Sequence, residues 1–346
     1  MSASLDNFDY ALPPAQIAAH PPPRRDGARL LDVRGNLPQI RTFRALPTLL
    51  REGDLAIIND SKVIPARLPG AKEGGGRAEI FAERFLPNGE VLAQIRAARA
   101  PKAGACLNAG GQFIVCERRT DGFFRLRAID RHGKTIDARA RFLRRGQTPL
   151  PPYIRRPLED ADRRRYQTIF ARHAGSVAAP TAGLHFTPTV VSRLAARGVN
   201  MANITLHVGA GTFLPLRRGL AAQKLHSERF RVSAKTAAAI TAAKKRGGRI
   251  VAVGTTVLRA LESAADKNGV CAAEGETDLF IKPGHCFRSA DLLLTNFHMP
   301  RSSLLVLTCT FGGQKRVMDA YRHAVSQKMR FYSYGDAMLL SRADAV

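Results

Sequence analysis

Short runs in which apolar and polar residues alternate fill the chain from about Arg67 to Leu150. Glycines and the turn pairs Asn-Gly and Asp-Gly interrupt these runs, and the proline-rich TPLPPYI follows the last of them. Alternation is typical of strands with one buried face, and such turns join antiparallel neighbours. We therefore predict a small antiparallel sheet or barrel with strands in GGGRAEIFAERF, VLAQIRAARA, QFIVCERR and FFRLRAID.

Apolar strands alternate with clearly delimited helices in the C-terminal part of the chain. Thr187 can cap a helix that Gly198 ends, and Ser233 and Gly247 delimit the next helix in the same way. The segments NMANITLHV and RIVAV that follow these helices are rich in apolar and β-branched residues, as buried strands are. Strands that alternate with helices indicate an α/β core.

The domain organisation follows from these two patterns. The segment LAIINDSKVIPARL, just before the alternating runs, is expected to be a buried strand and loop of the α/β core. The predicted fold class is therefore α/β: a barrel-like mixed sheet with helices, formed by residues 1–66 and 151–346, which a small antiparallel β-barrel domain at residues 67–150 interrupts. A chain of 346 residues exceeds what one hydrophobic core usually serves, and its hydrophobic share of 45% supports a sizeable core.

Charge is the unusual feature of the composition. Lys and Arg number 54 against 28 Asp and Glu, which gives a formal net charge of +26. A field of this sign attracts polyanions, so we expect an RNA or DNA partner. For any single cluster, a solvated surface and a phosphate contact stay equally open; the clusters are Arg24-Arg25, Arg144-Arg145, Arg155-Arg156 and Arg163 to Arg165.

Several classes of protein are disfavoured. The apolar LLVLTCTF is far shorter than a membrane span, and the first residues lack the hydrophobic region of a secretory signal. The 5 cysteines include no CxxC pair and the histidines no HxxxH pair, so we expect reduced thiols, no zinc ribbon and no metal. These observations predict a cytoplasmic protein without a membrane partner.

Three segments combine glycine, hydroxyl groups and histidine beside predicted strand ends. They are GSVAAPTAGLHFT, which starts at Gly175, TLHVGAGTF, which starts at Thr205, and VGTTVLRALE, which starts at Val253. Ligands of α/β sheets bind at the carboxyl ends of strands, where small side chains leave room and free helix-start amides suit a carboxylate or phosphate. Together the segments predict a nucleoside-sized pocket, although tight packing and ordinary helix capping would also explain them one by one.

Candidates for proton transfer are histidines and carboxylates near these segments. His226 and Glu228 lie on one short stretch, Asn296 and His298 follow an apolar run, and Asp336 lies near the end. A single buried histidine is more often a structural hydrogen-bonding group than a catalytic one. The cysteines lie in settings that favour packing.

Nine ordered motifs give the chain a resemblance to a known family. They are NDSKVIPARL, LPPYI with RYQTIFA, GSVAAPTAGLHFT, TLHVGAGTF, LHSE, AVGTTVLRALE, FIKPG, LLTNFHMPRSSLL and FYSYGDAML. In this order and over nearly the whole chain, they resemble the S-adenosylmethionine:tRNA ribosyltransferase-isomerases of the queuosine pathway. The departures are small: Ser61 and Lys62 replace an expected threonine and arginine, and His285 takes the place of an aromatic residue.

The resemblance implies a reaction, a fold and partners. The ribosyl part of S-adenosylmethionine would be transferred to 7-aminomethyl-7-deazaguanine at the wobble position of a tRNA anticodon stem-loop and rearranged there. Epoxyqueuosine-tRNA, adenine and methionine would be the products. The implied fold is an α/β domain interrupted by a β-barrel, with S-adenosylmethionine as co-substrate, no metal and no prosthetic group. We expect the chain to act as a monomer.

Site residues are assigned on the motifs that match. His207 or His185 is the expected base, Glu228 would orient His226 or the ribose, and Asp336 would face the guanine-like base. Arg259 is expected to pair with the methionyl carboxylate. The other expected S-adenosylmethionine contacts are Thr181, Gly183, Gly209, Gly211, Thr212, Phe213, Gly254, Thr255 and Thr256, and the expected tRNA contacts are Lys62, Arg67, Arg155 and Arg156.

Two other functions stay possible at this point. A tRNA methyltransferase would need the same co-substrate and a basic surface, but the GxGxxG-like fingerprint is incomplete because Leu214 stands where its third glycine would be. A non-catalytic RNA-binding module would leave the three small-residue segments unexplained. Release of adenine and methionine, release of S-adenosylhomocysteine, or no binding of S-adenosylmethionine separates the three.

Overall fold

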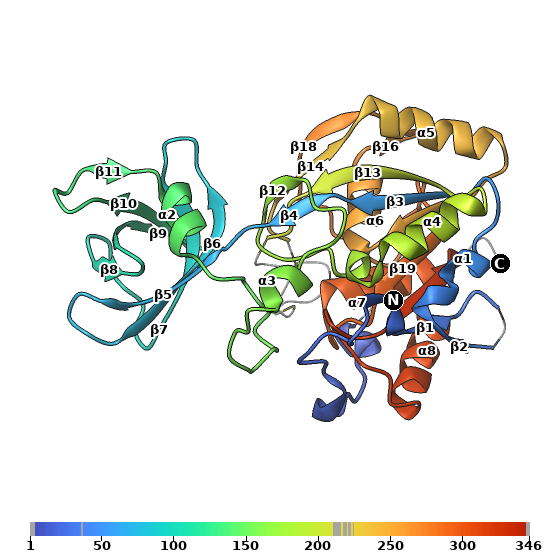
Figure 1. The fold of residues 1–346 in the computed structure, drawn as a ribbon, viewed down its shortest axis with the longest axis horizontal. Coiled ribbons are helices and arrows are strands. Elements are labelled where there is room, and N and C mark those ends of the chain that lie inside the picture. Colours follow the sequence, from blue (N-terminus) through green and yellow to red (C-terminus); the bar gives the residue numbers. More distant parts are fainter. Residues whose placement is uncertain are drawn as a thin grey trace.

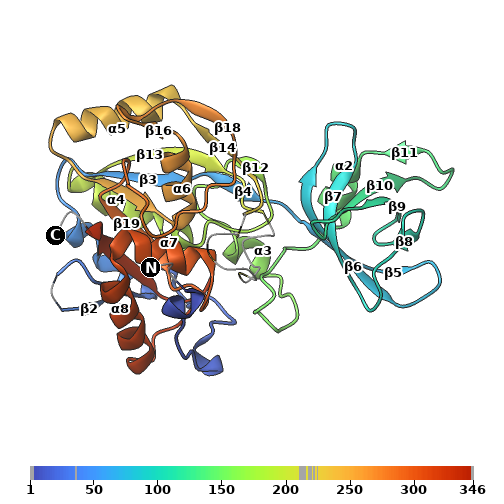
Figure 2. The same cartoon turned by 180° about the vertical axis from the view of Figure 1, so that it is seen from behind.

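A computed structural model describes residues 4–35, 37–209, 216, 220, 223 and 225–343. Figures 1 and 2 show a large body of sheet and helices and a smaller barrel at one end of the molecule. The chain enters the barrel after β4 (Ser61–Val63), which pairs in parallel with β12 (His173–Ser176) in the larger body. The barrel is therefore an insertion: the chain leaves the larger body after β4 and returns to it at β12.

The larger body is built on one mixed sheet of nine strands. Four neighbouring strands run in parallel: β13 (Asn200–Leu206), β3 (Leu55–Asn59), β15 (Ile250–Val253) and β19 (Leu292–Asn296). Their carboxyl ends therefore meet at one edge of the sheet. The order continues on one side with β20 (Ala337–Ser341), β1 (Arg29–Asp32) and β2 (Gln39–Thr42), and on the other with β14 (Glu228–Val232) and β18 (Ala273–Thr277).

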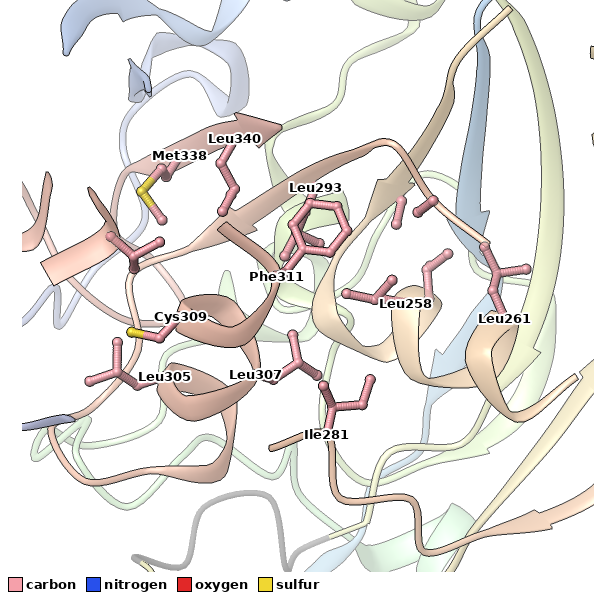
Figure 3. Packing of buried hydrophobic residues seen from close by; sticks show 14 of the residues in the cluster. Leu258, Leu261, Ile281, Leu293, Leu305, Leu307, Cys309, Phe311, Met338 and Leu340 are labelled. Atoms are coloured by element: carbon pink, nitrogen blue, oxygen red, sulfur yellow. The ribbon is translucent and has the colours of Figure 1, made fainter. Parts of the chain in front are cut away.

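Helices cover both faces of this sheet. Leu55 and Ile57 of β3 share a core with one set of helices, whereas Ala56 and Ile58, which point to the opposite face, share a core with the other. Figure 3 shows the first core between α6, α7 and the strands. The first set is α5 (Ala234–Lys245), α6 (Thr255–Ser263), α7 (Ser303–Gly312) and α8 (Gln314–Ser326), and the second is α1 (Leu46–Leu49) and α4 (Pro188–Ala196).

Local sequence signals explain where these helices begin. Thr187 accepts a hydrogen bond from the backbone N–H of Val190, and Ser233 accepts one from Thr236, so both predicted caps are confirmed. Two further short elements are α3 (Asp162–Arg165), which lies at the junction with the barrel, and the 3₁₀ helix η5 (Thr181–His185), which packs against β19. A small hairpin of β16 (Ala265–Asp266) and β17 (Gly269–Val270) follows α6.

The smaller body is a closed antiparallel barrel. Its strand order is β10, β7, β6, β5, β8 and β9, and β9 pairs back with β10. The strands are β5 (Arg67–Lys72), β6 (Arg77–Phe85), β7 (Val91–Ala97), β8 (Cys106–Asn108), β9 (Gln112–Arg118) and β10 (Phe124–Ile129), followed by β11 (Thr135–Ile136) and α2 (Ala138–Arg145). The predicted fold class is confirmed. The division into an α/β domain of residues 1–66 and 151–346 and an inserted barrel domain of residues 67–150 stays a prediction.

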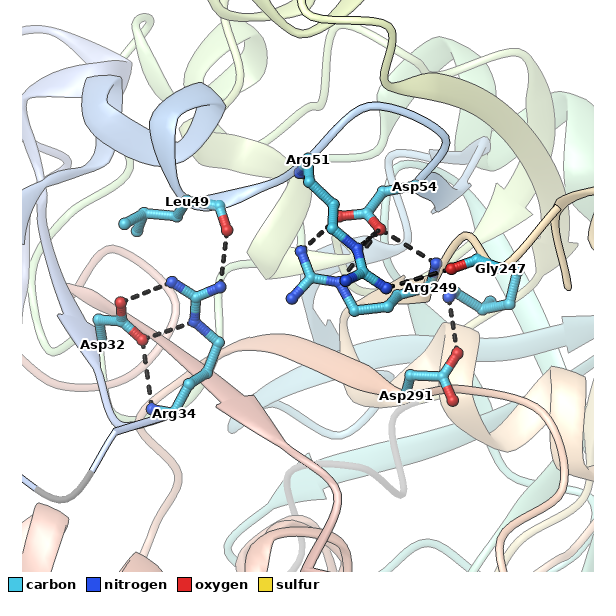
Figure 4. Close-up of polar contacts among 9 residues, drawn as sticks. Asp32, Arg34, Leu49, Arg51, Asp54, Gly247, Arg249 and Asp291 are labelled. Atoms are coloured by element: carbon cyan, nitrogen blue, oxygen red, sulfur yellow. Dashed lines mark hydrogen bonds and ion pairs between the residues drawn. The ribbon is translucent and has the colours of Figure 1, made fainter. Parts of the chain in front are cut away.

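The amino edge of the parallel strands is closed by ion pairs. Asp54, which precedes β3, is fully buried and accepts hydrogen bonds from the Arg249 side chain, at 3.1 Å from Nε, and from the backbone N–H of Arg51 and Arg249 (Figure 4). Asp291 accepts a further bond from the N–H of Ile250 at 2.8 Å. Burial alone would raise the pKa of Asp54, but these hydrogen bonds outweigh it and lower the pKa. This edge is therefore structural.

Candidate active site at the carboxyl edge of the sheet

A cleft of about 670 Å³ opens at the carboxyl ends of β15 and β19. We call it the strand-end cleft. Most of the side chains in its walls are small or apolar. They leave room for a ligand and place few charged groups next to it. It is lined by Tyr153, Ala178, Ala179, Pro180, Thr181, Ala182, Val208, Gly254, Thr255, Thr256, Thr295, Asn296, Phe297, His298, Met299, Ser302, Leu304, Tyr332 and Ser333.

The start of α6 forms one wall of the strand-end cleft. Gly254 has φ of 101°, a value that favours glycine, and its N–H donates to the Leu294 carbonyl of β19 at 2.8 Å. No side chain of the described residues caps the helix there, which leaves the N–H groups of Thr255 and Thr256 open to a ligand within this part of the chain. A helix start of this kind attracts a carboxylate or a phosphate.

The GSVAAPTAGLHFT segment has two roles in the structure. Its first half packs against the strand ends, because Ser176 Oγ accepts from the N–H of Val208 at 2.9 Å and the N–H of Val177 donates to the Val208 carbonyl at 3.0 Å. Its middle, residues 178–182, lines the strand-end cleft. Gly183 lies outside the lining, and a Cβ there would meet Thr168 Cγ2 at 3.0 Å. Both interpretations of the segment therefore hold, each for a different part.

His207 lies in a second hollow, between the sheet and the barrel. We call it the junction pocket; it also measures about 670 Å³. Ser61 Oγ is 2.9 Å from His207 Nδ1, and Gly175 lies so close that a Cβ there would be 2.8 Å from the imidazole. Burial, followed by the charges of Arg229 and His173, lowers the pKa of His207. The pocket is lined by Ile64, Glu83, Arg84, Phe85, Arg139, Ala174, Gly175, His207, Gly209, Ser227, Glu228 and Arg229.

Glu228 and Arg259 form a buried ion pair beside this pocket. The other carboxylate oxygen of Glu228 accepts from the N–H of Gly209 at 2.9 Å, which fixes the backbone where β13 ends. The guanidinium of Arg259 serves Glu228 through Nη1 and the Leu279 carbonyl through Nε, whereas its buried Nη2 has no hydrogen-bond partner among the described residues. That Arg259 pairs with a ligand carboxylate stays a prediction. His226 packs edge-to-face on Phe123 of the barrel, with ring centroids 4.9 Å apart.

His185 and Asp336 have structural surroundings. His185 is stacked on Phe43 and its Nε2 lies 3.2 Å from Asn296 Nδ2, while burial lowers its pKa to about 4. The Asp336 carboxylate accepts from the backbone N–H groups of Arg29 and Arg330, both at 2.8 Å, and pairs with the Arg29 side chain. Neither residue lines the strand-end cleft or the junction pocket. In this structure both residues support their neighbours, and their assigned roles in catalysis stay predictions.

Asn296 and His298, by contrast, line the strand-end cleft. His298 Nε2 is 2.8 Å from Thr295 Oγ1, and burial lowers its pKa to about 3. In the sequence both residues follow an apolar run, but nothing there distinguishes His298 from the other histidines or marks Asn296 as a residue of the site. The strand register supplies that signal, since Asn296 is the last residue of β19.

A wide basic cleft lies where the barrel meets the larger body. Lys62 lines it, as does the exposed Leu143. Two predicted tRNA contacts have partners within the chain: Arg67 pairs with Glu79 at 2.6 Å, and Arg156 makes two bonds of 2.7 Å to Asp162. Their contact with tRNA stays a prediction. Arg155 is exposed but does not line the cleft. The remaining basic residues of the lining are Arg25, Arg144, Arg163 and Arg164.

Three predicted contacts, Gly211, Thr212 and Phe213, lie outside the described residues. Within the described ranges, no group of three or more His, Cys, Asp or Glu residues could hold a metal ion. Over the same ranges, every helix is too short or too polar to cross a membrane.

Comparisons with known proteins agree with this architecture. The family described as "Queuosine biosynthesis protein" matches residues 5–340. The chain belongs to this family. A relative from Azoarcus sp. (strain BH72), an S-adenosylmethionine:tRNA ribosyltransferase-isomerase, is 50% identical over 346 residues, which cover 99% of each chain. A relative of the same name from Gluconacetobacter diazotrophicus is 51% identical over 352 residues, covering 99% of this chain and 98% of the relative.

A solved structure extends the comparison to three dimensions. The crystal structure of the S-adenosylmethionine tRNA ribosyltransferase from Thermotoga maritima matches with a TM-score of 0.55 and 34% identity, over 96% of this chain and 99% of that one. The resemblance drawn from the ordered motifs is thereby confirmed, and the family is one of transferases in queuosine biosynthesis.

Proposed function

We propose that the protein transfers and isomerises the ribosyl group of S-adenosylmethionine onto 7-aminomethyl-7-deazaguanine at the wobble position of a tRNA. Epoxyqueuosine-tRNA forms, and adenine and methionine leave. One observation carries this proposal: a cleft for a nucleoside, a pocket with a histidine and a basic cleft adjoin one another at one edge of the sheet. Ile64 and Ala174 line both the junction pocket and the basic cleft. His207 and Val208, neighbours in sequence, line the junction pocket and the strand-end cleft respectively.

S-Adenosylmethionine would occupy the strand-end cleft. Its carboxylate suits the free N–H groups of Thr255 and Thr256 at the start of α6, where the helix dipole adds to their attraction. The adenine ring suits the apolar walls that residues 178–182 and Tyr332 provide.

The tRNA would lie along the basic cleft. Phosphate groups of the anticodon stem-loop would meet Lys62, Arg144, Arg163 and Arg164, and the splayed wobble base would enter the junction pocket. A tRNA substrate also suits a cytoplasmic protein, and we expect it to act as a monomer.

His207 is then the base of the reaction. The aminomethyl nitrogen is a nucleophile only after it loses a proton, and a neutral imidazole beside it accepts that proton. Because the pKa of His207 is lowered, its neutral form prevails at neutral pH. The sulfonium makes the C5′ protons of the ribose acidic, which lets the sugar rearrange once a base is near. A positioned base contributes about 10²–10⁴-fold to a rate.

The test is incubation of the protein with a precursor-bearing anticodon stem-loop and ribose-labelled S-adenosylmethionine. Mass analysis of the RNA should show the added ribosyl-derived group, and free adenine and methionine should appear in equal amounts. S-Adenosylhomocysteine in place of these products would identify a methyltransferase and refute the proposal. An unchanged RNA together with no bound S-adenosylmethionine would leave only an RNA-binding module.

A further inference from the structure

Asn296 is the most unusual polar side chain of the strand-end cleft. The residue is only 2% exposed, and it is one of those that line the cleft. Among the residues that the structure describes, its Oδ1 atom has no hydrogen-bond partner. A buried polar atom without a partner is costly, so an acceptor in this position is explained best by a ligand that supplies the donor.

The orientation of the Asn296 amide follows from its other contacts. Nδ2 lies 3.1 Å from the carbonyl of Tyr332 and 3.4 Å from the carbonyl of Asp336. Carbonyls only accept, so the NH₂ group must face them, and a flipped amide would set oxygen against oxygen. Oδ1 is therefore the end of the amide that does not face these two carbonyls.

His185 is compatible with the same orientation. Its Nε2 is 3.2 Å from Asn296 Nδ2, and with the NH₂ group placed by the two carbonyls this nitrogen accepts, as it can in a neutral imidazole. The ring is buried, stacked on Phe43 with centroids 4.9 Å apart, and it bonds to the Arg25 backbone. His185 is thus held rigidly, and it holds Asn296 in turn.

The surroundings of Asn296 are those of an aromatic ring site. Phe297 and Tyr332 line the cleft beside it, and the ring of Tyr153 lies 4.6 Å from that of Tyr332. The charged end of a ligand is better served by the start of α6, which follows the neighbouring strand β15. The flat, apolar part of a bound nucleoside therefore belongs next to Asn296.

We propose that Asn296 Oδ1 accepts a hydrogen bond from the 6-amino group of the adenine ring and so selects adenosyl over inosyl ligands. The proposal rests on the proposed function, because it assumes that the strand-end cleft binds S-adenosylmethionine. In S-inosylmethionine a carbonyl oxygen replaces the amino group, and two acceptors would then face each other in a buried site.

Calorimetric titration of the full-length protein with S-adenosylmethionine and S-inosylmethionine, without RNA, tests this. The wild type should bind the adenosyl ligand about tenfold or more tightly than the inosyl ligand, because an unmatched buried acceptor costs at least that much. In Asn296→Ala the ratio should fall to about one to threefold, because the discriminating acceptor is gone. Leu304→Ala, an apolar change in the same cleft, should weaken both ligands and keep the wild-type ratio.

Each outcome has one meaning. A wild-type ratio near one, or an Asn296→Ala variant that keeps the wild-type ratio, would overturn the assignment of Oδ1 to the amino group; a bond to a ribose hydroxyl gives this result. Failure of the wild type to bind S-adenosylmethionine at all would instead refute the proposed function. Thermal melting checks the fold of each variant, and if Asn296→Ala does not fold, Asn296→Ser takes its place with the same expected ratio.

Discussion

Replacement of Gly175 by alanine should displace the His207 imidazole while His207 itself stays unchanged. An added Cβ would lie 2.8 Å from Cε1 and Nδ1 of the imidazole and 3.0 Å from Nε2. Ordinary contacts between heavy atoms are about 3.5–4.0 Å, so the ring must retreat by roughly 0.7 Å or more. Gly175 itself tolerates alanine, since its φ lies outside the left-handed region, and the register of β12 against β4 is already irregular there.

The expected loss is large because a general base must lie close to the proton that it removes. Retreat of the imidazole would disturb its 2.9 Å contact with Ser61 and its position relative to the nitrogen that it deprotonates in the proposed reaction. A displacement of about 1 Å costs roughly 10² in rate. His207→Ala sets the ceiling of the effect at about 10²–10⁴, the contribution of a positioned base.

Single-turnover ribosyl transfer at saturating RNA and S-adenosylmethionine is the assay. Gly175→Ala should slow the wild type by about 10² but leave the His207→Ala protein nearly unchanged, since the ring it displaces is gone. Gly74→Ala is the matched control, because an added Cβ there meets nothing within 4 Å. A Gly175→Ala rate equal to the wild type, or the same loss in both backgrounds, would refute this account of His207.

Three further predictions concern stability, RNA binding and pH. Asp54→Asn should lower the free energy of unfolding by about 2–4 kcal/mol at pH 7, measured in urea. Because the folded pKa of Asp54 is lowered, its contribution is complete above about pH 4 and is lost as pH falls further, so the difference from wild type should shrink in acid. Arg163→Gln should weaken binding of the anticodon stem-loop and reduce the slope of log affinity against log salt concentration by about 0.7. The affinity is measured at roughly 50 to 300 mM salt. Arg193 is exposed on α4 and outside the basic cleft, so Arg193→Gln should change neither the affinity nor the slope. His207→Gln should abolish the acidic limb of the single-turnover pH profile, which lies below the ordinary histidine pKa of about 6.5; a limb that persists in the variant would assign the base elsewhere.

Local features of the fold were predictable because they depend on neighbouring residues. The caps at Thr187 and Ser233 act over three residues, and the alternating runs of the barrel need only a period of two. The position of the cleft was predictable for a related reason. Once strands alternate with helices, their carboxyl ends meet at one edge, and the segments that follow them are brought together.

The roles of individual charged residues could not be predicted, because their partners are distant in sequence. Asp336 pairs with Arg29, 307 positions away, and Arg259 pairs with Glu228, 31 positions away. Arg156 differs from these two, because its partner Asp162 is only six positions away. The pair was missed because the neighbouring arginines suggested a phosphate-binding surface. A buried carboxylate nearby changes the meaning of such a cluster, and burial is a property of the fold.

Gly209 shows what the inserted barrel contributes to the site. A Cβ at this position would lie 2.2 Å from Oε1 of Glu83, a residue of β6 in the barrel, so the barrel approaches the backbone at the end of β13 as closely as atoms allow. Arg84 of the same strand pairs with Glu276 of β18 at 2.5 Å, which ties the barrel to the edge of the sheet. Barrel residues also form one wall of the junction pocket that contains His207. A rotation of the barrel away from the sheet would therefore open this pocket to water, and the insertion forms part of the junction pocket as well as of the basic cleft.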